Sequence, residues 1–303
     1  MKIEKRYLIK EKKDLIFAKL DLKNYLKDFI DIDFFIFALM ELGTNLYKHT
    51  DGGEIWILKE GEKRAIASLD KGKGIKNINW ALEKGTTTYK GSMGIGLYQL
   101  SRNDKYKFEI FSKENVGTII LLHDFNLKEV YLSESYYNND INGDFFAKKG
   151  HFFLFGDASG HGIKAYKSAE FVKKIFLNTL FSCSFIEDFF REIDKKIKEK
   201  SLRGAVLSII EVTKSRFKIC GVGNISMIYH NELITQKDGV IGVVFSNASK
   251  YEFSRNDRLI IFSDGILFEN IKNFLYIKSD YLLALCSIFY SPVLDDKSIL
   301  ILR

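Results

Sequence analysis

Four short acidic motifs adjoin apolar, strand-like runs in the second half of the chain. Three of these runs read FFLFGD, LIIFSDG and DDKSILIL, and they carry Asp157, Asp264 and the pair Asp295-Asp296. The fourth motif, Asn142-Gly143-Asp144, precedes them in the sequence. Carboxylates at the ends of strands can converge on one edge of a β-sandwich, so the pattern predicts a layered β structure with an acidic edge.

Such an edge predicts bound metal. Converging carboxylates repel one another unless a hard divalent cation lies between them, which indicates Mg²⁺ or Mn²⁺. Two metal ions can lower the pKa of a bridging water and stabilise an in-line attack on phosphorus, so that no protein nucleophile is needed. A single Asp-Gly pair is more often an ordinary turn, and the prediction therefore depends on all four motifs together.

The cysteines exclude a different class of phosphatase. Cys183, Cys220 and Cys286 are odd in number and far apart, and none is followed six residues later by Arg. This spacing argues against a cysteine nucleophile and a zinc site, and it is typical of a reducing cytosol. The amino-terminal segment is too charged for a signal peptide, and no run of 18 apolar residues occurs. We expect a soluble cytoplasmic protein without a membrane segment.

Length and composition predict two domains. The 303 residues are 46% apolar and 28% charged, which is enough to bury a core in each half. The net charge of +7 does not predict a nucleic-acid partner, because lysines are spread along the chain and no nucleic-acid motif appears. Hydrophobic patterning weakens over 125–140, so we place one domain at 1–125 and the other at 126–303.

Hydrophobic spacing predicts the main elements of both halves. Phe35, Leu39, Leu42 and Leu46 recur at helical intervals in a helix that starts at Asp31. The other expected elements are strands at 4–9, 106–112 and 117–122, a hairpin of 54–59 with 64–69, helices at 164–180 and 185–200, and several short strands between 205 and 302.

Polar residues on the first of these helices form one face. Glu41, Asn45 and His49 lie at i, i+4 and i+8, beside an apolar stripe that would pack on a sheet. Such a helix can hold Mg²⁺ and phosphate on one side while it stays docked on the other. Taken alone, an amphipathic helix with a solvated polar face explains the pattern as well.

Two glycine-rich motifs follow this helix. In Asp70-Lys-Gly72-Lys-Gly74 the carboxylate can accept the amino group of a purine, and the glycines let the backbone approach the ring. Gly91-Ser-Met-Gly94-Ile-Gly96 runs into a helix, whose free N–H groups can bind phosphate, and Gly117-Thr118 closes the set. Each motif is weak alone; their order and spacing carry the prediction, and no P-loop is present.

Residues 1–125 resemble the histidine-kinase-like (GHKL, Bergerat-fold) ATPases, and among them the RsbT type of switch serine kinase. The resemblance implies ATP with Mg²⁺ as ligand and Glu41 as the base for a protein serine hydroxyl. It implies that Asn45 holds Mg²⁺ and Asp70 binds adenine. The implied nucleotide contacts also include Gly72, Gly74, Gly94, Gly96 and Thr118. Lys90 could assist phosphate binding or be an ordinary solvated lysine.

The stretches GDASGHGIKA and FSDGI, with GVGNISMI at 221–228, resemble the PPM metal-dependent protein phosphatases of the SpoIIE/RsbX branch. The resemblance implies that Asp157 bridges two Mg²⁺ or Mn²⁺ ions and that the Ala158 carbonyl is a ligand. The further implied ligands are Asp264 and Asp295, with Asp144 bound directly or through water and Asp296 as an acidic neighbour. His161 would assist the leaving group or fix its loop by hydrogen bonding.

Together the two resemblances predict an α/β protein. The first part would be a Bergerat-type α/β sandwich with helices on one face of a mixed sheet, and the second a four-layer α/β/β/α sandwich of PPM type. They imply a kinase–phosphatase fusion of a partner-switching pathway, acting on STAS-domain proteins such as a sigma-factor regulator. Two alternatives stay open: a nucleotide-dependent binding switch, and an active phosphatase with a first domain that only senses ATP.

Overall fold

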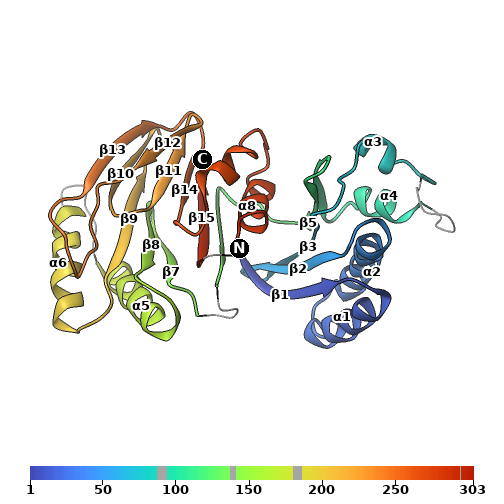
Figure 1. The fold of residues 1–303 in the computed structure, drawn as a ribbon, viewed down its shortest axis with the longest axis horizontal. Helices are drawn as coiled ribbons and strands as arrows, with labels where there is room; N and C mark the ends of the chain where they lie inside the picture. Colours follow the sequence, from blue (N-terminus) through green and yellow to red (C-terminus); the bar gives the residue numbers. More distant parts are fainter. Residues whose placement is uncertain (87–93, 137–140, 180–185, 294) are drawn as a thin grey trace. The chain divides into compact units, whose positions relative to one another are not determined.

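The computed structural model describes residues 1–86, 94–136, 141–179, 186–293 and 295–303 (Figure 1). It divides into two compact units, Met1–Asn126 and Leu127–Arg303. Lys90, Gly91 and Cys183 lie outside the described residues. Within the described part of the chain, no helix has both the length and the hydropathy needed to cross a membrane.

The first unit is one five-stranded sheet with two long helices packed on it. The strand order is β1-β2-β3-β5-β4. The elements are β1 (Lys2–Ile9), α1 (Lys12–Tyr25), α2 (Ile32–His49), β2 (Gly53–Glu60), β3 (Lys63–Leu69), the short helices α3 (Ile78–Ala81) and α4 (Gly96–Ser101), β4 (Lys107–Lys113) and β5 (Gly117–His123). The expected strands, hairpin and helix of this half are confirmed, with ends shifted by a few residues.

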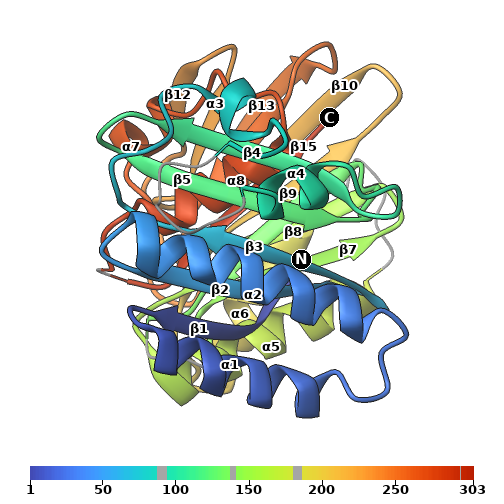
Figure 2. The ribbon, with the colours of Figure 1, turned by 90° about the vertical axis from the view of Figure 1, so that its right-hand side faces the viewer.

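The expectation of a mixed sheet is wrong, because every pair of neighbouring strands in this unit is antiparallel. The reason lies in the connection between β1 and β2. It contains two helices, α1 and α2, which pack against each other side by side (Figure 2). The chain therefore crosses the length of the sheet twice before β2 begins, and β2 runs opposite to β1.

Helix α1 has no counterpart among the sequence predictions. Leu15, Ala18 and Leu22 are buried and face the core, as in any docked helix. Ile16, Phe17 and Leu20, however, are exposed. Apolar side chains on both faces hide the 3.6-residue period, so the pattern could not be read from the sequence.

The second unit contains two five-stranded antiparallel sheets, ordered β13-β10-β9-β8-β7 and β12-β11-β14-β15-β6. The strands are β6 (Glu129–Glu134), β7 (Asp144–Lys149), β8 (Phe152–Ala158), β9 (Ala205–Val212), β10 (Arg216–Val222), β11 (Ser226–Tyr229), β12 (Glu232–Thr235), β13 (Ser249–Ser254), β14 (Leu259–Phe262) and β15 (Lys297–Leu302). The helices are α5 (Gly162–Asn178), α6 (Ile186–Glu199), α7 (Phe268–Lys272) and α8 (Asp280–Phe289).

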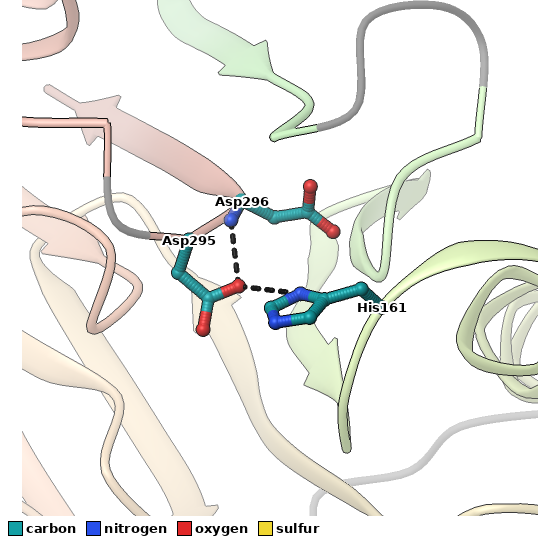
Figure 3. A group of neighbouring side chains, drawn as sticks. All are labelled: His161, Asp295 and Asp296. Atoms are coloured by element: carbon teal, nitrogen blue, oxygen red, sulfur yellow. Dashed lines mark hydrogen bonds and ion pairs between the residues drawn. The ribbon is translucent and has the colours of Figure 1, made fainter.

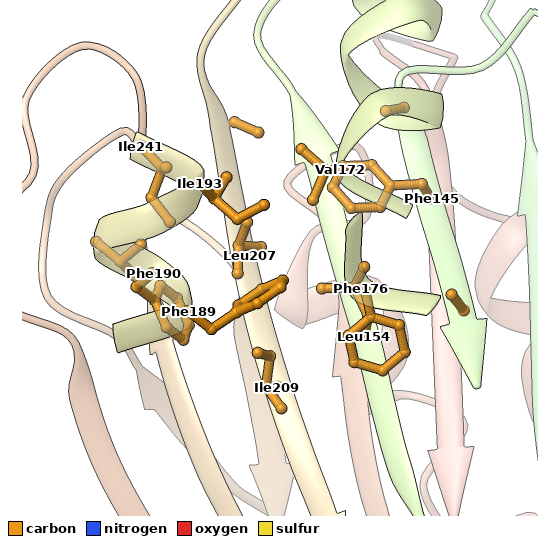
Figure 4. Close-up of a cluster of buried hydrophobic side chains, with 14 of the residues drawn as sticks. Phe145, Leu154, Val172, Phe176, Phe189, Phe190, Ile193, Leu207, Ile209 and Ile241 are labelled. Atoms are coloured by element: carbon orange, nitrogen blue, oxygen red, sulfur yellow. The ribbon is translucent and has the colours of Figure 1, made fainter. Parts of the chain in front are cut away.

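Two apolar cores hold this unit together. Between the sheets, residues such as Phe155 of β8 and Ile261 of β14 pack into one buried cluster. On the outer face of the β8-containing sheet, Phe176 of α5 and Phe189 of α6 contact each other edge to face in a second buried cluster that includes Leu207 (Figure 4). Helix α8 packs on β6 and β15 of the other sheet. The unit therefore has four layers in the order helix, sheet, sheet, helix.

Strand β6 lies in the segment where the sequence pattern weakens. Val130 and Leu132 are buried while their neighbours are partly exposed, which is the alternation of an edge strand. Six residues are too short a run to stand out from the polar residues around it. Its pairing with β15 ties residues 129–134 to the second unit.

Candidate functional site

Asp144 and Asp157 stand opposite one another at the end of the β7–β8 pair. Asp144 is the first residue of β7, and the register places it against Asp157 of β8. Directly opposed residues in an antiparallel pair have Cβ atoms about 5 Å apart, so these two carboxylates share one edge of the sheet. The sequence pattern that ends the FFLFGD run thus has a structural basis: the strand is buried along its length and ends at the acidic edge.

A serine from the facing sheet holds the Asp144 carboxylate. Ser263, which follows β14, donates from Oγ to Asp144 Oδ2 at 2.7 Å. Ser263 Oγ also accepts the backbone N–H of Ser298 at 2.9 Å. Among the described residues, the other oxygen of this buried carboxylate, Asp144 Oδ1, has no hydrogen-bond partner. An ionised oxygen left so is costly, and a bound cation would satisfy it.

His161, Asp295 and Asp296 form the tightest group of potential metal ligands. One ligand atom from each lies within 4.8 Å of the others (Figure 3). His161 Nδ1 is 2.9 Å from Asp295 Oδ1, and the same oxygen accepts the Asp296 backbone N–H at 2.7 Å. In the described part of the chain, the other predicted ligands do not belong to this tight group.

Asp296 has a positioning role that its sequence context does not reveal. Its side chain is buried, and its two oxygens accept backbone N–H groups of Tyr136 and Gly143, each at 2.7 Å. The carboxylate thereby ties the segment before β7 to the start of β15. The Tyr136 ring also stacks on His161, with ring centroids 5.4 Å apart.

Asp264 is held from the GVGN segment. Asn224 donates from Nδ2 to Asp264 Oδ2. Burial raises the pKa of the Asp264 carboxyl, and the neighbouring Asp295 raises it further. Asn224 and Ser263 were not among the predicted site residues, because the pairing of β11 with β14 brings Asn224 to Asp264 and the packing of the two sheets brings Ser263 to Asp144.

The carboxylates interact as one electrostatic group. Burial, followed by repulsion from Asp144, Asp264, Asp295 and Asp296, raises the pKa of Asp157. Burial is also the largest cause of the raised pKa of Asp144. The structure thus brings the predicted acidic residues together, and their mutual repulsion is what a divalent cation would relieve.

The backbone after Asp157 packs closely against the opposite loop. The Ala158 N–H donates to the Gly143 carbonyl at 3.1 Å. A Cβ built on Gly143 would lie 3.1 Å from Ala158 O and 3.2 Å from Asp296 Oδ2. Gly143 therefore leaves the Ala158 carbonyl next to a carboxylate, where a larger residue would crowd both.

In the first unit, Asp70 is buried at the end of β3 and organises the following loop. Its Oδ1 accepts the N–H of Gly72 at 2.8 Å and that of Thr118 at 3.3 Å. Burial nevertheless raises the pKa of the Asp70 carboxyl. Gly74 has φ +71°, and a Cβ there would lie 2.2 Å from the Lys113 carbonyl oxygen. Only glycine fits this turn.

Glu41 lies directly against Gly96. A Cβ built on Gly96 would be 1.8 Å from Glu41 Oε2, so the carboxylate occupies the space that a side chain would fill. Glu41 is half-buried, and burial raises its pKa. Gly94, with φ +62°, stands just before this contact, and its carbonyl accepts the Gly85 N–H at 3.0 Å.

Helix α2 connects the contact between Glu41 and Gly96 with the loop that follows Asp70. At its carboxyl end, Thr50 Cγ2 lies 2.9 Å from a Cβ built on Gly72. Glu41 precedes Thr50 by nine residues, about 13 Å along the helix. Asn45 lies between these ends and is partly buried, whereas His49 is exposed.

Comparison with known proteins gives structural similarity only. No protein-family model matches the chain, and no curated protein matches it. RsbX in complex with magnesium has a TM-score of 0.46 at 19% identity, covering 57% of this chain and 92% of that chain. The catalytic domain of the phosphatase PstP with two manganese ions has a TM-score of 0.44 at 14% identity, covering 57% and 96%. A structure from work on the bacterial stressosome has a TM-score of 0.47 at 20% identity, covering 59% and 100%.

Proposed function

We propose that residues 127–303 form a metal-dependent phosphatase of the PPM type, in the SpoIIE/RsbX branch, that hydrolyses phosphoserine or phosphothreonine. One observation carries the proposal: Asp144 and Asp157 stand side by side on a sheet edge where further carboxylates raise the pKa of Asp157. Acidic groups are rarely gathered so closely for stability, because each raises the cost of ionising the others.

The donor set fits two hard cations. All the side-chain ligands would be oxygen atoms, which Mg²⁺ and Mn²⁺ prefer, and Asp144 Oδ1 is buried without a partner among the described residues. The residues that would hold the ions are Asp144, Asp157, the Ala158 carbonyl, Asp264 and Asp295. When bound, the ions would lower the pKa of the attacking water and offset the charge of the phosphoryl oxygens.

The reaction is the hydrolysis of a phosphate monoester. The water oxygen forms a new bond to phosphorus, the bond from phosphorus to the serine oxygen breaks, and that oxygen takes up a proton. The products are the free hydroxyl side chain and orthophosphate. His161 is held by Asp295 and by the Tyr136 ring. It would either supply the proton to the leaving oxygen or keep the loop in place.

The test is hydrolysis of a phosphoserine peptide by the full chain with and without Mn²⁺ or Mg²⁺. We expect activity only with metal, and loss of nearly all of it in Asp157→Ala. Asp188→Ala, on the surface helix α6, removes a carboxylate outside the site and should remain active. Full activity in EDTA, or in Asp157→Ala, would contradict the proposal.

The proposed physiological substrates are phosphorylated STAS-domain regulators, including a regulator of a sigma factor, in the cytoplasm. The support is the resemblance of both halves to enzymes of partner-switching pathways. Incubation of the chain with a panel of phosphorylated STAS proteins and unrelated phosphoproteins tests it. Equal rates on both groups would count against this choice of substrate.

For the first unit we propose ATP binding with Mg²⁺, supported by one observation beside the carboxyl end of α2 and one at the middle of this helix. Asp70 accepts the backbone N–H groups of Gly72 and Thr118 and so fixes the loop in which it could accept a purine amino group. About 13 Å away along the helix, Glu41 faces Gly96, where it would serve as the base toward a protein hydroxyl. Asn45, between them, would hold the metal, and Gly72, Gly74, Gly94 and Thr118 would shape the nucleotide site.

Calorimetry with ATP and Mg²⁺ tests this proposal in the full chain. Asp70→Asn should weaken binding, because it replaces one acceptor oxygen with an NH₂ group that faces either the backbone N–H groups of Gly72 and Thr118 or the purine amino group. Labelled ATP with STAS proteins then separates phosphoryl transfer from nucleotide binding alone. Phosphoprotein that accumulates in Asp157→Ala and disappears on adding Glu41→Ala supports a kinase. Binding without transfer supports a sequestration switch or an ATP sensor.

A further inference from the structure

Arg203 lies beside the loop that joins Asp157 to His161. Its guanidinium donates from Nη1 to the Ser159 carbonyl at 3.0 Å. A Cβ built on Gly160 would lie 2.0 Å from the same nitrogen, so the guanidinium occupies the space that glycine leaves open. Arg203 is exposed, and its guanidinium has five N–H donors, of which the Ser159 carbonyl takes one.

The backbone around Arg203 is fixed. The next residue, Gly204, accepts the Ser159 N–H on its carbonyl at 2.8 Å. A Cβ on Gly204 would lie 2.6 Å from Val240 Cγ1 and 2.9 Å from the Ile241 carbonyl oxygen, which shows how tightly this backbone is enclosed. Strand β9 begins at Ala205, opposite Ala158. The arginine is therefore presented from a rigid strand start.

The negative charge of the carboxylates and of the substrate explains why an arginine would be useful at position 203. Five carboxylates converge there, and a phosphoserine carries nearly two further negative charges at neutral pH. Divalent ions, when bound, would offset part of this charge, but the substrate also needs a donor that recognises phosphoryl oxygens by geometry. Arginine does so through parallel N–H groups, whereas lysine acts as a point charge.

We infer that Arg203 binds the phosphoryl group of the substrate at the edge of the carboxylate group. The inference rests on the proposed phosphatase function and adds a substrate-binding residue to it. The alternative role is structural: Arg203 would only donate its hydrogen bond to the Ser159 carbonyl and so hold the loop after Asp157 in its conformation. The two roles predict different effects of mutation. Loss of a structural hydrogen bond would disturb the metal ligands, whereas loss of a phosphate contact would lower the affinity for substrate.

The experiment compares Arg203→Ala and Arg203→Lys with the full wild-type chain on a phosphoserine peptide in Mn²⁺. We expect Arg203→Ala to raise KM about tenfold or more, and to weaken inhibition by orthophosphate in parallel, because charge-assisted contacts are lost. The value of kcat should change less than KM, and the Mn²⁺ concentration for half-maximal activity should not change. Arg203→Lys should give intermediate values, and it decides the question if the alanine variant does not fold.

Arg216→Ala is the matched control. Arg216 pairs with Glu252 at the start of β10, next to the end of β9 that lies about 23 Å from Ala205. It removes the same charge and should change neither KM nor phosphate inhibition. Unchanged KM in Arg203→Ala, or a shift confined to the Mn²⁺ requirement, would overturn the inference while leaving the phosphatase proposal intact. A wild-type chain without metal-dependent hydrolysis would overturn the phosphatase proposal itself, and this inference with it.

Discussion

Ser263 Oγ donates to Asp144 Oδ2 at 2.7 Å, and this contact joins the ends of strands from two different sheets. The same hydroxyl accepts the Ser298 N–H, so Ser263 fixes the acidic edge from the side opposite β7. It also determines which oxygen of Asp144 remains for a cation.

Ser263→Ala should therefore lower the stability of the fold and weaken metal binding. The substitution leaves a buried carboxylate oxygen and the Ser298 N–H without their partner, which costs about 1–3 kcal/mol. We expect a lower free energy of unfolding in urea and a higher Mn²⁺ concentration for half-maximal activity. Ser168→Ala is the control: Ser168 is also buried, but it only donates to a carbonyl within α5. Equal effects of the two variants would argue against a special role for Ser263.

Asp295 and Asp296 are neighbours, but we expect Asp296 to stabilise the fold and Asp295 to bind metal. Asp296→Asn replaces one acceptor oxygen with an NH₂ group that faces the Tyr136 or Gly143 N–H, so it should destabilise the fold by about 1–3 kcal/mol. Asp295 is about two-fifths exposed, and Asp295→Asn should leave stability nearly unchanged while it reduces metal-dependent activity. Urea unfolding and hydrolysis rates of both variants check this. A destabilised Asp295→Asn beside a stable Asp296→Asn would reverse the assignment.

The pKa of Asp144 predicts how the metal-free protein responds to pH. Burial and the neighbouring carboxylates raise that pKa above the ordinary value of 3.8, so the folded state binds the proton more tightly than the unfolded state. Stability from this group is therefore present at low pH and is lost as the pH rises above about 4 through the folded-state pKa.

Thermal unfolding in EDTA at pH 5 and pH 8 measures this effect. Wild type should lose more stability between the two pH values than Asp144→Asn, because the variant lacks the titration of Asp144 and also the repulsion by which Asp144 raises the pKa of Asp157. Added Mn²⁺ should stabilise wild type more at pH 8 than at pH 5, since ligands bind as carboxylates. Identical pH dependence in the two proteins would show that Asp144 does not titrate in this range.

Two glycines in the first unit test the backbone requirement after Asp70. Gly61 and Gly74 both have positive φ, but a Cβ on Gly61 meets open space, whereas one on Gly74 meets the Lys113 carbonyl at 2.2 Å. Gly61→Ala should cost about 1–2 kcal/mol for the left-handed conformation alone. Gly74→Ala adds a backbone clash and should cost about 2–4 kcal/mol. Equal midpoints in urea would mean that the loop relaxes without cost.

Features that follow from a local hydrophobic pattern could be predicted from the sequence. Contacts that depend on strand pairing or on the packing of two sheets could not. Asp157 could be found because a buried run ends there, and α2 because its buried residues recur at helical spacing. The contact of Asp144 with Ser263 spans 119 residues and two sheets, so no local pattern announces it. Asp296 was predicted only as an acidic neighbour of the ligands, because nothing in the sequence shows that it accepts the N–H groups of Tyr136 and Gly143.

The same reasoning explains the errors in the first unit. The mixed sheet was implied by the resemblance to Bergerat-type ATPases, but the paired helices α1 and α2 bring the chain back to the end of the sheet at which β1 finishes, so β2 runs opposite to β1. Helix α1 itself was hidden because Phe17 and Leu20 face outward. The pairing of Glu41 with Gly96 joins two motifs that were predicted separately, and the sequence could not show that they touch.

That contact supports a prediction that isolates it from other effects. Gly96→Ala places a methyl group where Glu41 Oε2 now lies, 1.8 Å from the Cβ position, and should destabilise the first unit and weaken any ATP binding. In a Glu41→Ala background the space is free, so the same change should cost nothing or stabilise α4 by up to about 1 kcal/mol, as alanine replaces glycine at a helical position. Urea unfolding of the four proteins in this double-mutant cycle gives the coupling energy directly. Additive effects would show that Glu41 does not occupy the space beside Gly96.

Calorimetry with ATP on the same four proteins then tells whether this contact also shapes the nucleotide site, since Gly96→Ala should weaken binding more in the wild-type background than beside Glu41→Ala.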